Sequence, residues 1–337
     1  MSDSLSDAAL DRLRVVASWP EFESDRYTVV AEIGRGGMGT VYLARDEALG
    51  RAVAMKVSSA VATSSLEQRL QTEARILARL QHPGIVPIHD VGRLADGRLF
   101  YVMQRVRGET LVAHLRSVPE LSARLRIFER ICDPVAFAHA HGFIHRDLKP
   151  ENVMVGAFGE VLVMDWGIAK VLRSEAVASS ATASSEAPPR DGRTDAGTIL
   201  GTHGFMAPEQ ASGAGEAVDV RADVYGLGAL LFMMLTGESP PSEADQAIAR
   251  IGRYRGVPKP LRAICARALA PHPGERYSDV QSLAADIARF RAGQAVLAHH
   301  ETVLERTTRL ARTYRTPLLL ILAYLVMRTI VALTTGR

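Results

Sequence analysis

The prevailing spacing of apolar residues along this 337-residue chain changes from strand-like to helical near Gly108. Before that point, short apolar runs with turn residues between them indicate strands at residues 28–33, 40–44, 52–57, 86–91 and 99–103. Residues 65–80 have helical spacing instead, and their apolar residues Leu66, Leu70, Ile76, Leu77 and Leu80 share one side. After Gly108 helical spacing dominates, as in residues 121–140. The sequence therefore predicts an α+β fold in which a small five-stranded β lobe with one helix precedes a larger, mainly helical lobe.

Length and composition narrow the class of protein. A chain of 337 residues is long for one hydrophobic core and suits two lobes, or one domain with appendages. Its formal net charge is +3, but the arginines are scattered, which gives no indication of a nucleic-acid partner. The two cysteines, Cys132 and Cys265, are far apart and are predicted to be buried thiols of a reducing compartment. The N-terminus has no apolar core typical of a secretory signal peptide.

The segment Ile144–Asn152, I-H-R-D-L-K-P-E-N, concentrates reactive side chains in one short loop. Asp147 is a candidate base, Lys149 a phosphate-binding cation and Asn152 a metal ligand. Phosphoryl transfer needs these three chemistries side by side. With this motif the chain resembles the eukaryotic-type Ser/Thr protein kinases of bacteria, many of which are membrane-anchored. The resemblance covers roughly residues 27–290 and implies the bilobal protein kinase fold.

The segment G-R-G-G-M-G-T-V, residues 34–41, lies between two predicted strands. Glycines there let the backbone approach phosphates closely. A flexible hairpin or a dinucleotide fingerprint would also match, but a dinucleotide site would need a helix where a strand follows here. The resemblance implies that ATP binds in this lobe. The expected nucleotide contacts are Ile33, Gly34, Arg35, Gly36, Gly37, Met38, Gly39, Val41, Ala54, Lys56, Met103, Gln104, Val106 and Met154.

The strand V-A-M-K, residues 53–56, resembles the strand that carries the ATP-binding lysine of kinases. A lysine on a strand is otherwise an ordinary surface residue, but Glu73 on the predicted helix would form the ion pair that fixes Lys56. By the same resemblance Met103 is the gatekeeper residue, and residues 104–106 form the hinge whose backbone would bond adenine.

The resemblance also assigns the transfer half of the site. Asp147 would orient the substrate hydroxyl, Lys149 would contact the γ-phosphate, and Asn152 and Asp165 would bind Mg2+, with Mn2+ as an alternative. Asp165-Trp166-Gly167 stands where the family has D-F-G, so Trp166 is a departure. His145 is expected to have a structural role. In pairs outside the loop, Glu209 is expected to bond Arg276, and Asp223 to cap the backbone at residues 145–146.

Residues 169–201 form a Ser-, Ala- and Thr-rich stretch that is interpreted as a long activation segment. Arg146, with Lys170 and Arg69, is a candidate pocket for a phosphate on this segment. Thr194 and Thr198 are the candidate acceptors of autophosphorylation in trans, which would bring two copies together. The other hydroxyls are expected only to solvate the loop. Thr202 would contact the loop at Asp147 and favour Ser/Thr over Tyr as acceptor.

Beyond a 26-residue N-terminal extension and the kinase domain (27–107 and 108–290), the chain continues as a basic linker, residues 291–317. Residues 318–335 are apolar enough to suggest a transmembrane helix, although Arg328 lies near its centre. A helix packed on the protein or a partner, and an interfacial helix, are the alternatives. Arginines before the segment predict a kinase domain on the cytoplasmic side, tethered to the inner membrane.

The leading hypothesis is an active enzyme that phosphorylates Ser and Thr hydroxyls of proteins in bacterial signal transduction. A pseudokinase scaffold is the rival reading, but scaffolds of that kind usually lack at least one of Lys56, Glu73, Asp147, Asn152 and Asp165, all of which are present. A small-molecule phosphotransferase fits less well, because the segment A-P-E at residues 207–209 serves protein substrates in the family.

Overall fold

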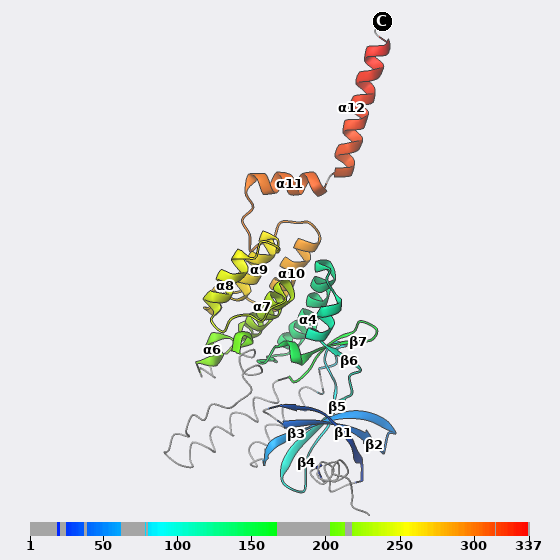
Figure 1. The fold of residues 1–337 in the computed structure, drawn as a ribbon, viewed down its shortest axis with the longest axis vertical. Coiled ribbons are helices and arrows are strands. Elements are labelled where there is room, and N and C mark those ends of the chain that lie inside the picture. Colours follow the sequence, from blue (N-terminus) through cyan, green and yellow to red (C-terminus); the bar gives the residue numbers. More distant parts are fainter. Residues whose placement is uncertain are drawn as a thin grey trace, which may run out of the picture.

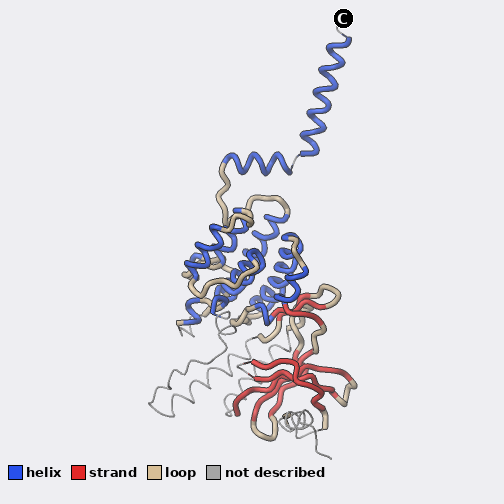
Figure 2. The backbone as a smooth tube through the Cα atoms, viewed as in Figure 1, coloured by secondary structure: helices blue, strands red, loops and turns tan. Residues whose placement is uncertain are grey.

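The computed structural model describes residues 19–20, 25–36, 39–61, 78, 80–166, 203–212, 218–313 and 315–335. Figure 1 shows a β-sheet lobe, a larger helical lobe, and two further helices that lead away from the helical lobe on the side opposite the sheet. In Figure 2 most strands lie in the smaller lobe and most helices in the larger one. The predicted two-lobed α+β architecture is therefore confirmed.

The smaller lobe contains the five predicted strands as one antiparallel sheet. They are β1 (Tyr27–Gly36), β2 (Gly39–Asp46), β3 (Arg51–Val61), β4 (Ile88–Arg93) and β5 (Arg98–Gln104), in the order β1-β2-β3-β5-β4. β4 begins two residues later than predicted, after Pro87, because proline has no N–H to donate to a ladder. The predicted helix over 65–80 falls almost wholly outside the described residues.

Side-chain alternation gives this sheet two different faces. One face carries Tyr42, Met55 and Val102, which pack into a small core of their own. The other carries Ala54 and Met103, which belong to the large core shared with the helical lobe. Lys56 follows Ala54 by two residues, so strand geometry places it on the face that meets the larger lobe.

The larger lobe is organised around α7 (Arg221–Thr236), whose residues from Ala222 to Met234 are all buried. A helix that is apolar all round belongs in the middle of a core. The helices α4 (Leu121–Ala140), α9 (Lys259–Ala268) and α10 (Val280–Arg291) pack on it, and α3 (Leu111–Ser117), α6 (Pro208–Ala211) and α8 (Ala244–Arg253) complete the described helices of the lobe. Cys132 and Cys265 are buried free thiols, as predicted.

A second, three-stranded sheet lies where the two lobes meet. It consists of β6 (Gly108–Thr110), β7 (Val153–Gly156) and β8 (Val161–Val163), paired in that order. The short helix η1 (Pro150–Asn152) leads directly into β7. The short helices η2 (His203–Phe205) and η4 (Pro273–Glu275) lie further along the chain. The β7–β8 hairpin of this sheet therefore connects the predicted catalytic loop, which ends at Asn152, to Asp165.

The chain that follows α10 is hydrogen-bonded to the helical lobe before it extends away from the lobe. Buried Asp286 accepts hydrogen bonds from the backbone N–H groups of Leu297 and Ala298, at 2.8 and 3.0 Å. Lys259 Nζ then lies 2.6 Å from Glu305 Oε1 on α11 (Val303–Thr313). These bonds tie the start of the tail to α9 and α10.

The last helix, α12 (Arg315–Thr335), covers the predicted transmembrane segment. Large apolar side chains are exposed along it, among them Leu319, Leu322 and Val326. In the part of the chain that the structure describes, however, no helix combines the length and the apolar character needed to cross a membrane. The prediction of a transmembrane helix is therefore not supported. Arg328 weighs against insertion, because an arginine in mid-membrane costs about 2.5–3.5 kcal/mol.

Candidate active site

The glycine-rich hairpin joins β1 to β2, the strands expected to carry part of the nucleotide site. Gly36 pairs with Gly39 across it, and Gly37 and Met38 at its tip lie outside the described residues. Gly39 has φ +147°, and a Cβ there would lie 2.0 Å from the carbonyl oxygen of Val57. Only glycine therefore lets β2 approach β3 this closely.

The apolar part of the predicted nucleotide site is assembled from both lobes. Ala54 and Met103 are paired neighbours on β3 and β5, and both are buried. Val41 and Val106 pack on the same core, and Met154 on β7 is half-buried. Ile33 on β1, unlike these residues, is 52% exposed. Gly34 and Arg35 lie on β1, where Arg35 is bonded to Glu32 through two hydrogen bonds of 2.9 and 2.7 Å.

Lys56 reaches from β3 to the carboxylate of Asp165. Its Nζ lies 2.6 Å from Asp165 Oδ2, and Tyr101 donates its hydroxyl to Asp165 Oδ1 at 2.9 Å. Burial raises the pKa of Asp165, but Lys56 and Tyr101 outweigh it, so this pKa lies below its usual value. The carboxylate is therefore charged at neutral pH. Glu73, the predicted partner of Lys56, lies outside the described residues.

The predicted catalytic loop places two functional side chains beside Asp147. Lys149 Nζ lies 2.8 Å from Asp147 Oδ2, and Asn152 donates from Nδ2 to the same oxygen at 3.0 Å. Asn152 also donates to the Asp147 backbone carbonyl at 2.8 Å. Because both bonds use Nδ2, the amide oxygen of Asn152 is the atom left to bind a cation.

Two non-glycine residues of the site have left-handed backbone conformations. They are Arg146, with φ +67°, and Asp165, with φ +56°. Such conformations are uncommon outside glycine and persist where the surrounding structure holds them. Asp223 accepts from the N–H groups of His145 and Arg146, both at 2.7 Å, which confirms the predicted cap. On the other side of Arg146, Gln210 donates to its carbonyl oxygen at 3.0 Å.

His145 connects the catalytic loop to the segment that carries Asp165. Its Nε2 lies 2.8 Å from the carbonyl oxygen of Met164, so Nε2 must donate, and Nδ1 then accepts from the N–H of Asp147 at 3.2 Å. The Met164 N–H donates back to the Asn152 carbonyl at 2.8 Å. The buried ring of His145 also packs on Trp166 with a centroid distance of 4.8 Å. These contacts are those of a structural histidine, as predicted.

The ion pair predicted between Glu209 and Arg276 is confirmed. Arg276 Nη1 and Nη2 donate to the two carboxylate oxygens of Glu209 at 2.7 and 2.8 Å. The arginine side chain is fully buried and donates further to three backbone carbonyls, those of Ala270, Pro271 and Arg221. The segment that follows the predicted activation segment is thereby fixed to the base of the helical lobe.

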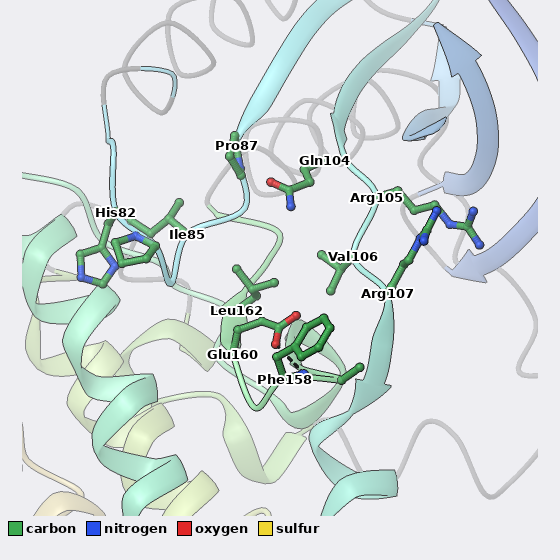
Figure 3. Close-up of a pocket in the computed structure, with 12 residues that line it drawn as sticks. His82, Ile85, Pro87, Gln104, Arg105, Val106, Arg107, Phe158, Glu160 and Leu162 are labelled. Carbon is green, nitrogen blue, oxygen red and sulfur yellow. Dashed lines mark hydrogen bonds between the residues drawn. The ribbon is translucent and has the colours of Figure 1, made fainter. Parts of the chain in front are cut away.

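A hollow of about 560 Å³ lies beside the hinge, between the chain before β4 and the β7–β8 turn. Figure 3 shows Gln104 and Val106 on the side of this hollow, whereas Arg105 and Arg107 point away from it. Phe158 on the turn is 98% exposed. Lys56, Asp147 and Asp165 do not line this hollow, so it is separate from the predicted transfer site.

Several predicted residues lie outside the described part of the chain. They are Gly37, Met38, Arg69, Glu73, Lys170, Thr194, Thr198 and Thr202. The residues that the structure does describe, Lys56, Asp147, Lys149, Asn152 and Asp165, are brought to one place by β3, the loop before β7 and the end of β8. The Lys56–Asp165 pair and the Asp147–Lys149–Asn152 group are linked through the backbone bond from Met164 to Asn152.

Comparison with known families gives a match along most of the chain. The model of the protein kinase domain matches residues 27–291. This chain belongs to the protein kinase family. The serine/threonine-protein kinase PknD of Protochlamydia amoebophila is 33% identical over 306 residues, which is 81% of this chain and 30% of the relative. PknB of Mycolicibacterium smegmatis is 37% identical over 312 residues, 87% of this chain and 47% of the relative.

Solved structures agree with this assignment. The kinase domain of Mycobacterium tuberculosis PknI has a TM-score of 0.60 and 27% sequence identity, and the match covers 80% of this chain and 98% of that one. The chain thus spans a whole kinase domain of a solved relative, but less than half the length of the curated relatives above.

By its resemblance to the family's D-F-G motif, the segment Asp165-Trp166-Gly167 has Trp166 where the family usually has phenylalanine. Its indole Nε1 donates to the Val163 carbonyl at 3.0 Å, so the added N–H is satisfied within the turn. Only 3% of the residue is exposed. Tryptophan is therefore accommodated here by one local hydrogen bond and by its contact with His145.

Sequence reasoning missed two residues that contact the site, Tyr101 and Gln210. Tyr101 carried a usable signal, because on a paired strand it shares the face of Met103 and therefore points toward Lys56. Gln210 carried none, because its bond to Arg146 joins residues 64 positions apart. His139 was also missed, and its Nε2 lies 2.7 Å from Asp223 Oδ2.

Proposed function

We propose that this chain is a protein serine/threonine kinase that transfers the γ-phosphate of ATP to Ser and Thr hydroxyls of proteins. The observation that carries the proposal is the convergence of Lys56, Asp165, Asp147 and Asn152 at the junction of the lobes. A cation for phosphate, two oxygen ligands for a divalent ion and a carboxylate for the acceptor hydroxyl are the components that phosphoryl transfer requires. The names of the related proteins support the same activity.

The residues fit a divalent cation of the hard, oxygen-binding type. Asp165 offers a carboxylate and Asn152 an amide oxygen, which suit Mg2+ when phosphate oxygens and water supply the remaining ligands. Among the described residues there is no cluster of three or more His, Cys, Asp or Glu that would form a complete metal cage. A shared ion held jointly by the protein and ATP matches this donor set. When bound, Mg2+ would neutralise charge that develops on the transferred phosphoryl group.

In the proposed reaction the acceptor Oγ forms a bond to the γ-phosphorus while the bond to the β,γ-bridging oxygen breaks, and ADP leaves. Asp147 accepts the proton of the hydroxyl. Its carboxylate is positioned by Lys149 and Asn152, at 2.8 and 3.0 Å, rather than left to rotate. Lys56 is placed to move from Asp165 to the phosphates of ATP, because both are anionic oxygen acceptors.

The direct test is phosphate transfer by the full chain with labelled ATP and Mg2+. We expect labelling of the protein itself and of a generic protein acceptor, on Ser and Thr, and its loss on chelation of the metal. Asp147→Asn should lower the rate by at least about 100-fold, because general base catalysis contributes on that scale. Asp133→Asn, the same change at an exposed position of α4, is the control and should keep full activity. Folded wild-type protein that labels nothing would overturn the proposal.

Regulation by autophosphorylation at Thr194 or Thr198 is part of the same proposal. Both residues lie outside the described part of the chain, so it rests on the sequence and on Arg146, whose side chain is exposed beside Asp147. An exposed arginine can bind the dianion of a phosphothreonine. The modification in trans would require two copies to meet.

We also propose that the kinase domain is cytoplasmic and is tethered to the inner membrane through its tail. Support comes from α12, whose exposed apolar side chains leave a surface that water does not favour. The arginines before α12 would face anionic lipid headgroups.

A further inference from the structure

Asp165 is held by two side chains that come from neighbouring strands of the same sheet. Lys56 on β3 bonds Oδ2 at 2.6 Å, and Tyr101 on β5 bonds Oδ1 at 2.9 Å. The two residues are paired partners in the β3–β5 ladder, so they project from the same face and reach the same carboxylate. Lys56 Nζ also lies 6.0 Å from the centroid of the Tyr101 ring.

ATP would compete for the bond between Lys56 and Asp165 but not for the bond between Tyr101 and Asp165. The ammonium of Lys56 is a cation that phosphate oxygens attract, so its bond to Asp165 is one that the nucleotide competes for. The hydroxyl of Tyr101 is neutral. The residue is only 4% exposed and belongs to the core on the face of the sheet that meets the helical lobe. Burial, and then the Asp165 carboxylate, raise the pKa of Tyr101 well above its usual value, so the phenol stays a donor.

Asp165 needs such a constraint more than an ordinary carboxylate does. Its backbone has φ +56°, a left-handed conformation, and it follows β8 by only two residues. Trp166 and Met164 fix the backbone on both sides of it through bonds to Val163 and Asn152. The rotation of the side chain itself is set by Tyr101 and Lys56 alone among the hydrogen bonds described for Asp165.

We propose that Tyr101 is a positioning residue of the phosphotransfer site, whose hydroxyl holds Asp165 Oδ1 and thereby presents Oδ2 to the divalent cation once Lys56 has turned to the phosphates. This inference rests on the proposed role of Asp165 as a metal ligand. It assigns a function to a strand residue that carries no group of its own for catalysis. The hydroxyl acts only through Asp165.

The test compares nucleotide binding with and without Mg2+ in the full-length protein. A fluorescent ATP analogue is titrated against wild type and Tyr101→Phe, and the ratio of the two affinities gives the gain that Mg2+ provides. We expect Tyr101→Phe to reduce this gain by about ten-fold, the size of one hydrogen bond to a charged group, while affinity without Mg2+ stays unchanged. In phosphotransfer, the Mg2+ concentration for half-maximal rate should rise by a similar factor.

The chain offers a matched control in Tyr277→Phe. Tyr277 also donates its hydroxyl to an aspartate, Asp286 Oδ2, at 2.9 Å, but in the helical lobe near the tail. This variant removes an equivalent bond and should lower the thermal midpoint without changing the Mg2+ dependence. If both variants alter the Mg2+ gain equally, the effect of Tyr101 is one of general stability and the proposal is wrong.

A third variant separates this inference from the proposed function. Asp165→Asn should abolish the gain in affinity that Mg2+ provides, and adding Tyr101→Phe to it should then have no further effect. If Asp165→Asn keeps the full gain, the metal-binding role of Asp165 fails and the inference falls with it. If Asp165→Asn loses the gain while Tyr101→Phe keeps it, only the role of Tyr101 is refuted.

Discussion

Arg276 shows what a single residue contributes to this lobe. Its guanidinium is buried and donates five described hydrogen bonds. Two go to the carboxylate oxygens of Glu209 and three to backbone carbonyl oxygens. A buried charge is tolerated only with such partners, and removing one partner costs much more than the pair contributes. The ring of Tyr225, 5.0 Å from the guanidinium, covers it further.

We therefore expect Glu209→Ala to lower the free energy of unfolding by about 3 kcal/mol, because it leaves the Arg276 charge buried with carbonyl partners only. Urea denaturation measures the change. Glu238→Ala breaks an ion pair with Arg250 whose two side chains are about half exposed, and it is the control. That variant should lose less than about 1 kcal/mol. Equal losses in the two variants would contradict the argument.

Contacts between site residues could be predicted from the sequence where the residues belong to one short motif. The set Asp147, Lys149 and Asn152 lies within six positions, and its assembly followed from the motif. The Glu209–Arg276 bond joins residues 67 positions apart, and only the family resemblance indicated it. The contact between Tyr101 and Asp165 was not predicted: strand pairing could have indicated that Tyr101 lies beside Lys56, but no local pattern records which carboxylate it meets across the junction of the lobes.

At the scale of elements, the β1–β2 hairpin shows how a strand pairing depends on one missing side chain. Gly39 lies at the start of β2 with its Cα against the backbone of β3. Of the other described glycines in the hairpin, Gly36 has open space where a Cβ would lie, and a Cβ at Gly34 would make only an ordinary contact of 3.8 Å with Val41 Cβ. The close approach is therefore confined to Gly39, and the rest of the hairpin is not restricted in this way.

We expect Gly39→Ala to destabilise the protein by about 1–3 kcal/mol, through overlap with the Val57 carbonyl and an unfavourable φ. Nucleotide affinity should fall with it, because β2 carries Val41 against the predicted adenine site. Gly252→Ala in α8 is the control: a Cβ there meets nothing within 4 Å, and alanine favours a helix. Urea denaturation and titration with a fluorescent ATP analogue measure both effects. A Gly39→Ala protein with unchanged stability would refute the steric argument.

The elements themselves were predicted well where periodicity is strong. All five strands of the sheet and the helix over residues 121–140 are present. The β4 start was wrong by two residues, because the role of Pro87 as a ladder boundary was not considered. The pairing of β6 with β7 was not predicted, since strands of three and four residues give too few alternations to be distinguished from loop.

At the scale of the whole molecule, the tail is fixed at one end and exposed at the other. Asp286 accepts from Tyr277, Arg289 and the backbone of Leu297 and Ala298, which holds the chain where it leaves the lobe. Beyond that point α12 exposes its large apolar side chains. Exposed apolar surface of this extent marks a region that another surface covers.

If the tail attaches the protein to a membrane, full-length protein should float with lipid vesicles in a density gradient. The double variant Leu322→Asp/Val326→Asp should remain at the bottom, because each aspartate costs about 2.5–3.5 kcal/mol in an apolar phase. Leu49→Asp changes another exposed leucine, on the turn between β2 and β3, and is the control that should still float. Wild-type protein that stays at the bottom without vesicle binding would contradict the tether.

The fastening of the chain at Asp286 also has a geometric consequence. It directs the tail away from the helical lobe on the side opposite the sheet, as Figure 1 shows. α12, with 21 residues, is about 30 Å long. Whatever surface receives it lies at the far pole of the molecule from the glycine hairpin. The helical lobe would therefore stand between that surface and the junction of the lobes, where the predicted transfer site lies, so a protein substrate could reach the site without passing the surface.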